Sequence, residues 1–146
     1  MKKILTKALT MLLVFMVVFT AVGTPASAAN LDKKAKKICR KYEKAGNKAK
    51  ALTGPVKVKY EKEGKVYHFT FTLNLKQDAS LFGLTKSVQP SAYKKTRDSI
   101  VKNTTKFRKK IKKQGIKKNS VTYVVNAGGK QLWVATDGKL TFDRYE

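Results

Sequence analysis

The chain is poor in residues that cross-link proteins, bind metals or carry negative charge. Its 146 residues include one Cys and one His, and nine Asp and Glu stand against 33 Lys and Arg. A single Cys excludes a disulfide within the chain and a thiolate metal site, so a packed core must stabilise the fold. No G-x-S-x-G motif, cluster of metal ligands or Gly-rich phosphate loop is present. We therefore expect no cofactor and no metal.

The excess of Lys gives a formal charge of +24, while 42% of the residues are hydrophobic and 10% are aromatic. This hydrophobic fraction is too high for a disordered polybasic tail, and the length suits one domain. Lys has a compact ammonium and lacks the bidentate geometry with which Arg reads phosphates and base edges. The composition indicates a folded domain that attracts polyanions by diffuse electrostatics.

The first 28 residues have the layout of a secretory signal peptide. A positive start with Lys2, Lys3 and Lys7 precedes an almost unbroken apolar run over residues 8–22, and Ala26-Ser27-Ala28 supplies an A-x-A cleavage site. The run is short for a span of about 20 residues, so a retained membrane anchor is the weaker alternative. Cys39 lies well beyond the run and is not placed for lipid attachment. We expect cleavage after Ala28, leaving residues 29–146 as one secreted domain, extracellular or associated with the cell wall.

Residues 31 to about 52 are predicted to form an amphipathic helix with Asn30 as its N-cap. Apolar or small residues recur every three or four positions, and lysines occupy the other side. Gly46-Asn47 is a candidate for an early end or a kink. Cys39 lies at the edge of the apolar stripe, which favours a buried side chain over the alternative of an intermolecular disulfide.

Alternating apolar and polar residues predict two strands, one from Val56 to Glu61 and one from Val66 to Leu75. A two-residue turn at Glu63-Gly64 would join them as a hairpin. The resulting predicted pairs are Tyr60 with Tyr67, Val58 with Phe69 and Val56 with Phe71. In that register His68 faces Lys59 on the polar side of the hairpin.

Residues 76–89 are interpreted as a loop with an apolar anchor at Leu81-Phe82-Gly83-Leu84. A second Lys-rich helix is predicted from Pro90 or Ser91 to a stop at Gly115-Ile116. Up to three strands follow, at residues 121–125, 131–136 and 139–145. The turn signal Asp137-Gly138 would place Trp133 opposite Phe142 and Ala135 opposite Leu140.

The order α-β-β-α-β-β-β predicts an α+β fold. Two amphipathic Lys-rich helices should pack on one face of a four- or five-stranded antiparallel sheet. The stretch Gly64-Lys65-Val66-Tyr67, the Lys-rich helix that ends at Gly115-Ile116, and the segment VTYVVNAGG at residues 121–129 resemble small secreted domains of unknown function from Gram-positive bacteria. The resemblance covers most of the chain after the signal sequence and implies no functional residues.

The positive charge is concentrated in the two predicted helices. Residues 31–52 hold nine basic and two acidic residues, and residues 91–118 hold twelve basic and one acidic. Because the apolar stripes must cover the sheet, the lysines should point outward as one basic surface. The candidates for polyanion binding are Lys36, Lys37, Arg40, Lys41 and Lys44 in the first helix and Lys102, Lys106, Lys109, Lys110 and Lys113 in the second.

These features predict a non-enzymatic binding or surface-associated protein. The expected partners are anionic cell-wall polymers or the anionic membrane surface, and any binding of nucleic acid should not be sequence-specific. One alternative is a small secreted metal-independent ribonuclease, with Glu61 and His68 as acid and base and Lys59 as the cation; a solvated sheet face is the simpler interpretation of these three residues. A second alternative is a cationic antimicrobial effector, whose helices would have to give their apolar faces to lipid.

Protein recovered from the culture medium should begin at Ala29, because Ala26 and Ala28 satisfy the small-residue requirement for signal-peptide cleavage. N-terminal sequencing measures the cleavage point. Protein in the medium that begins at Met1 would contradict both the cleavage and the assignment of residues 1–28.

Overall fold

The computed structural model describes residues 30–48 and 54–146. The predicted signal peptide, residues 1–28, and the predicted last residues of the first helix, 49–52, lie outside the described residues. Within the described ranges, no helix combines the length and the apolar character needed to cross a membrane.

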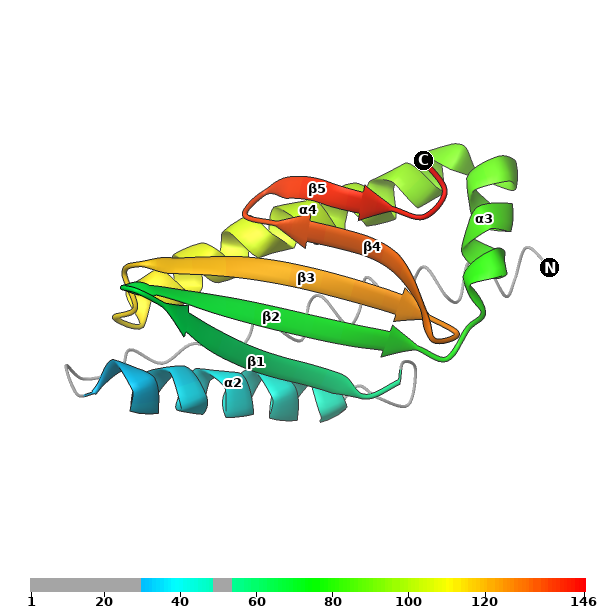
Figure 1. The fold of residues 1–146 in the computed structure, drawn as a ribbon. Coiled ribbons are helices and arrows are strands. Elements are labelled where there is room, and N and C mark those ends of the chain that lie inside the picture. The colour runs from blue at the N-terminus through cyan, green and yellow to red at the C-terminus, as the bar shows by residue number, and fades with distance from the viewer. Residues whose placement is uncertain (1–29, 49–53) are drawn as a thin grey trace.

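Figure 1 shows five strands in one sheet, with helices on one of its faces. Helix α2 (Leu31–Lys48) precedes strands β1 (Val56–Glu63) and β2 (Val66–Leu75). Helices α3 (Ala79–Val88) and α4 (Pro90–Lys113) then lead to strands β3 (Asn119–Ala127), β4 (Lys130–Thr136) and β5 (Lys139–Asp143). The strands lie in the sheet in their chain order. The predicted α+β class, with both Lys-rich helices packed on the sheet, is confirmed.

The sheet is mixed, so the prediction of an antiparallel sheet is wrong for its central pair. Strands β2 and β3 run parallel, whereas the other three pairs are antiparallel. A parallel pair needs a crossover connection of a dozen or more residues, and α3 with α4 provides it. The crossover places α4 against β3 and β4 on the same face that α2 covers near β1.

An aromatic cluster of Tyr42, Phe71, Phe107 and Tyr123 joins both long helices to the centre of the sheet. Phe71 on β2 stacks on Phe107 of α4 and on Tyr123 of β3, with ring centroids 4.9 and 5.8 Å apart. Tyr42 of α2 meets Phe71 and Phe107 edge-on, at 5.4 Å in both cases. All four side chains are about 1% exposed. Burial of these rings therefore fixes the positions of both helices.

Hydrogen bonds from the termini of α2 confirm one predicted cap and explain how the helix continues past Gly46. The Asn30 side chain accepts a hydrogen bond from the N–H of Asp32 at 2.9 Å, as an N-cap should. The helix runs on through Asn47, whose amide bonds the N–H and C=O of Val56 at 3.0 and 3.2 Å. Because β1 is an edge strand, this pairing covers part of an edge that would otherwise be open.

The first hairpin has a register two residues away from the predicted one. Its turn residues are Gly64 and Lys65, so Val58 pairs with Phe71. Gly64 has a φ of +58°, and a two-residue turn of the Gly-X type places glycine first because that position needs a positive φ. A shift of two keeps the same side chains on the buried face. The three predicted pairs, Tyr60 with Tyr67, Val58 with Phe69 and Val56 with Phe71, are nevertheless wrong.

Helix α3 occupies residues for which a loop was predicted. Its N-cap is Asp78, whose Oδ1 accepts hydrogen bonds from the N–H and the hydroxyl of Ser80 at 2.8 and 2.7 Å. The apolar residues of this short segment do not form one helical stripe, so periodicity could not reveal it. The predicted apolar anchor is confirmed, because Phe82 is buried and packs edge-on against Trp133.

The last hairpin matches one predicted pair and departs from the other. Ala135 pairs with Leu140, as expected from a turn at Asp137-Gly138. A register shift between Val134 and Ala135 then places Trp133 opposite Asp143, so the predicted pairing of Trp133 with Phe142 is wrong. A register shift of this kind means that one strand has an extra residue, which bends the strand and changes the direction of its side chains.

Asp143 is the centre of a buried polar network at the end of β5. Its carboxylate accepts hydrogen bonds from the Tyr93 hydroxyl at 2.5 Å and from Arg97 and the N–H of Tyr145 at 3.0 Å. The Tyr93 hydroxyl in turn accepts one from the Trp133 indole at 2.8 Å. Burial alone would raise the pKa of Asp143, but these donors outweigh it and hold the pKa below its usual value. The charged carboxylate therefore stabilises the folded state.

Asp143→Asn should lower the free energy of unfolding at pH 7 by about 2–3 kcal/mol. This is less than the roughly 3–5 kcal/mol for breaking a fully buried ion pair, because the Arg97 side chain is 19% exposed. A depressed folded-state pKa means that the carboxylate contributes stability above about pH 4, the usual pKa of Asp, and loses it as the pH falls through the folded-state value. Urea denaturation from pH 7 to pH 2.5 should show the difference between the two proteins shrinking toward the acid end.

Asp98→Asn is the matched control. The Asp98 carboxylate lies 3.5 Å from the Arg97 guanidinium, but its side chain is 45% exposed. Loss of such an exposed pair should cost less than about 1 kcal/mol. Equal effects of the two substitutions, or an Asp143→Asn effect that does not change with pH, would contradict the role given to Asp143.

Candidate polyanion-binding surface

Helices α2 and α4 lie next to each other and run in opposite directions on the covered face of the sheet. Near the middle of α2, Tyr42 contacts Phe107 of α4. At the start of α2, the Lys34 side chain reaches Gly115, directly after α4, where an added Cβ would lie 2.7 Å from the Lys34 Nζ. The two Lys-rich helices therefore cover the same face of the sheet and meet through these side chains.

The structure places all ten predicted polyanion-binding residues on the outside of these two helices. Their side chains belong to α2 or α4, whose apolar stripes are buried against the sheet. Lys41 and Lys110 are half-buried and the other eight are exposed. We call this set of ten residues the helix surface.

Like charges crowd one another on the helix surface. Burial, and then repulsion from Lys106 and Lys113, hold the pKa of Lys110 below its usual value. Lys106 and Lys113 lie four residues before and three residues after Lys110, which are neighbouring positions on a helix. An anion bound here would relieve this repulsion.

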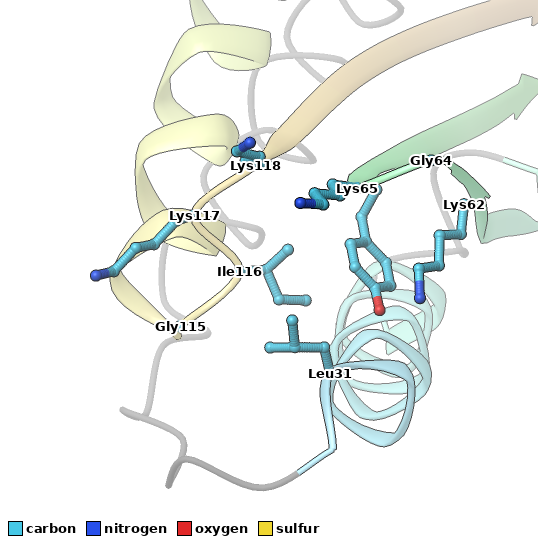
Figure 2. A pocket seen from close by; sticks show the side chains of 9 residues that line it. Leu31, Lys62, Gly64, Lys65, Gly115, Ile116, Lys117 and Lys118 are labelled. Carbon is cyan, nitrogen blue, oxygen red and sulfur yellow. The ribbon is translucent and has the colours of Figure 1, made fainter.

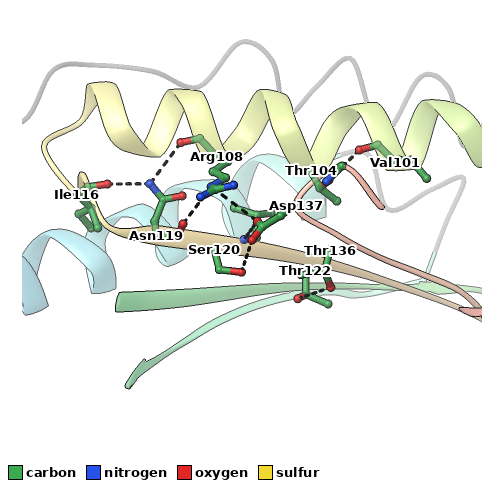
Figure 3. A network of polar contacts seen from close by, with 11 residues as sticks. Val101, Thr104, Arg108, Ile116, Asn119, Ser120, Thr122, Thr136 and Asp137 are labelled. Atoms are coloured by element: carbon green, nitrogen blue, oxygen red, sulfur yellow. Dashed lines mark hydrogen bonds and ion pairs between the residues drawn. The ribbon is translucent and has the colours of Figure 1, made fainter. Parts of the chain in front are cut away.

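Most of the few acidic side chains bind partners other than the lysines of the helix surface and do not balance its charge. Asp137 is an example: it accepts hydrogen bonds from the Ser120 hydroxyl and the N–H of Val121, both at 2.8 Å, and lies 3.9 Å from Arg108. Figure 3 shows this network between the end of α4 and β3. Seven of the nine carboxylates make hydrogen bonds or ion pairs with other described residues, namely Asp32, Glu43, Glu63, Asp78, Asp98, Asp137 and Asp143.

The exposed cations of the helix surface have no carboxylate partner within residues 30–48 and 54–146. The ion pairs found in these ranges involve Arg97, Arg108 and His68. The eight exposed members without an ion pair are Lys36, Lys37, Arg40, Lys44, Lys102, Lys106, Lys109 and Lys113. Solvation alone would explain exposed lysines, but it does not explain why the acids lie elsewhere.

A pocket of about 360 Å³ opens at one end of the two helices, where α2 begins, α4 ends and the β1–β2 turn lies (Figure 2). Leu31, Tyr67 and Ile116 give it apolar walls. Four lysines line it, Lys62, Lys65, Lys117 and Lys118. Sequence reasoning missed this site because these lysines lie outside the two helices. The sequence did contain a signal for this site, because Lys62 and Lys65 flank Gly64, and Lys117 and Lys118 follow Gly115.

Cys39 is buried, as predicted for a small side chain on the apolar stripe. It is 7% exposed, and burial raises the pKa of its thiol to about 12. The thiolate, which is the reactive form, is therefore scarce at neutral pH. This environment does not favour the alternative of an intermolecular disulfide.

The three candidate catalytic residues lie on the open face of the sheet, and their predicted arrangement is wrong. With the hairpin register corrected, His68 pairs with Glu61, while Lys59 pairs with Thr70. The imidazole Nε2 of His68 lies 3.5 Å from a carboxylate oxygen of Glu63, whose side chain is 88% exposed. None of the three candidates lines the pocket, which opens on the helix side. The described residues also contain no group of three or more side chains suited to hold a metal ion.

Comparisons of the chain with protein-family models, with curated proteins and with solved structures found no match.

Purified protein should not cleave RNA in the absence of added metal, because Lys59, Glu61 and His68 lie on the open face of the sheet and do not line the pocket. His68→Ala should change the free energy of unfolding by no more than about 0.5 kcal/mol, since the side chain is 41% exposed. A fluorogenic RNA assay with the parent, His68→Ala and Glu61→Gln proteins tests both expectations. Cleavage by the parent that falls at least about 100-fold in each variant would establish the ribonuclease alternative. Contaminating nuclease would survive both substitutions.

Proposed function

We propose that this protein is a secreted, non-enzymatic binding protein that attaches to anionic cell-envelope polymers through the helix surface. The phosphate polymers of the cell wall and the anionic membrane surface are the nearest polyanions for a secreted bacterial protein. The secreted location rests on the layout of residues 1–28, and the bacterial setting rests on the resemblance to Gram-positive domains.

The observation that carries the proposal is the separation of charge between the inside and the outside of the fold. Carboxylates such as Asp137 and Asp143 bind donors within the structure, whereas exposed cations of α2 and α4 have no carboxylate partner among the described residues. A field of one sign over two adjacent helices attracts polyanions and raises their local concentration. Because nearly all of these cations are Lys, the attraction should depend on charge density and not on ligand sequence.

The same packing argues against the antimicrobial alternative. A helix that inserts into a membrane surface must expose its apolar face to lipid. Here the apolar faces are occupied: Tyr42, Phe107 and Ile111 are each at most 1% exposed. Disruption of a bilayer would therefore require α2 and α4 to leave the sheet.

The test compares two variants with the same loss of charge. In the first, Lys106, Lys109, Lys110 and Lys113 on the helix surface are replaced by Gln. In the second, the exposed lysines Lys57, Lys59, Lys130 and Lys139, which lie on strands, are replaced by Gln. Binding is measured with purified phosphate-containing wall polymer, anionic liposomes, DNA and RNA, between about 50 and 200 mM salt.

The parent protein should lose roughly 1,000-fold in affinity over this salt range if about six phosphates are neutralised, because each contact releases counterions. The helix variant should bind more weakly and show a flatter salt dependence, whereas the strand variant should stay close to the parent. Equal losses in both variants would show that only net charge matters, and a flat salt dependence of the parent would remove the basis of the proposal. Circular dichroism checks that both variants fold.

A further inference from the structure

We infer that the pocket between α2, the β1–β2 turn and the α4–β3 connection binds a single phosphate ester that carries a short hydrocarbon group. This inference deepens the proposed function and rests on it for the choice of phosphate as the anion. The site is distinct from the helix surface, since none of the ten residues of that surface lines the pocket.

The charge of the pocket suits an anion. Lys62 and Lys65 come from the two sides of the β1–β2 turn, and Lys117 and Lys118 come from the connection that follows α4. No acidic residue lines the pocket. The neighbouring carboxylate of Asp32 accepts a hydrogen bond from the Tyr67 hydroxyl at 2.7 Å. Figure 2 shows Lys65 and Lys118 on the two sides of the opening.

A buried lysine behind the pocket wall adds to this positive potential. Lys34 is 8% exposed, and its ammonium makes no hydrogen bond or ion pair among the described residues. It lies against Gly115, a pocket residue whose φ of +101° ends α4. The carbonyl end of a helix favours a cation. The Lys34 ammonium therefore places a further positive charge beside Gly115.

The walls of the pocket suit a hydrocarbon group. Leu31 and Ile116 lie next to each other in the lining (Figure 2), and because Ile116 is only 1% exposed, Leu31 supplies most of the accessible apolar surface of the pair. Leu31 is 43% exposed and belongs to a small set of large exposed hydrophobic side chains on the described surface, with Val88 and Phe142. Ile116 is held in place because its N–H bonds the C=O of Ile111 at 3.3 Å in the helix C-cap. Covering Leu31 would remove apolar surface from water, which favours binding.

The size of the pocket sets the size of the ligand. Its volume of about 360 Å³ lies at the lower end of the usual range of small-molecule sites, about 300–1,000 Å³. A small ligand, such as a phosphate with a six-carbon chain, suits a pocket of this size.

The test titrates the purified protein with hexyl phosphate, inorganic phosphate, hexanol and glycerol 3-phosphate, and follows backbone amide shifts by NMR. Hexyl phosphate should bind at least tenfold more tightly than the other three probes, with the largest shifts at Leu31, Gly64, Lys65 and Ile116. The double substitution of Lys65 and Lys118 to Gln should weaken hexyl phosphate at least tenfold. The same change at Lys57 and Lys59, on the open face of the sheet, should have no effect. Leu31→Ser should weaken hexyl phosphate about fivefold and leave inorganic phosphate unchanged.

Several results would overturn the inference: equal affinity for hexyl phosphate and either inorganic phosphate or glycerol 3-phosphate, shifts confined to the helix surface, or no effect of the Lys65 and Lys118 substitutions. Dihexanoyl phosphatidylglycerol, below its micelle concentration, identifies the source of the phosphate. Tighter binding than hexyl phosphate indicates a membrane lipid, and weaker binding indicates a free monoester; both support the site. The fourfold helix variant separates the two proposals, because it should lose polymer binding and keep hexyl phosphate.

Discussion

The fold depends on the packing of four aromatic rings at the point where both long helices meet the central strands. Burial of 150 Å² or more per ring, at about 25 cal/mol per Å², contributes roughly 4 kcal/mol for each ring before conformational entropy is counted. Repulsion between lysines on neighbouring helical turns costs only a few tenths of a kcal/mol per pair. Tyr42, Phe71, Phe107 and Tyr123 can therefore hold α2 and α4 in place while the outer sides of these helices stay strongly positive.

The few acidic residues also have positions in the structure that their number alone does not reveal. Each internal carboxylate satisfies donors that would otherwise be left without an acceptor, as Asp137 does for Val121 and Asp143 does for Tyr93. An acid in such a position cannot also neutralise a lysine on the surface. The excess of positive charge is thus larger at the helix surface than the ratio of residues suggests, because the negative charges are partly withdrawn from the outside.

Sequence periodicity predicted which side chains are buried better than it predicted which residues are neighbours. Phe107 and Ile111 fall on a helical stripe of period 3.6, and Phe69 and Phe71 fall on one face of a strand of period 2. The buried face of each element can therefore be predicted without knowing which strands pair. Pairing itself depends on turn geometry. When Gly64 is the first residue of the turn and not the second, the hairpin register changes by two residues. In the last hairpin, a register shift beside Val134 changes the partner of Trp133. The short helix α3 was missed because its signal was the N-cap Asp78 and not a periodic stripe. The parallel central pair was missed although the predicted second helix already supplied a crossover of sufficient length.

The pocket could not be predicted because its walls come from three segments that only the parallel crossover brings together. Leu31 begins α2, Lys65 lies in the first hairpin turn, and Ile116 follows α4. The same crossover sets α4 antiparallel to α2, so the helix surface ends where the pocket opens. In the functions proposed here, the two regions differ in range: the helix surface attracts anionic polymers over about a Debye length, whereas the pocket selects one group by contact. Some ligands would carry both a polyanionic chain and a hydrophobic phosphate ester. Once the chain of such a ligand is bound to the helix surface, its phosphate ester is present at a high effective concentration near the pocket. The overall affinity then rises without any new contact at either site.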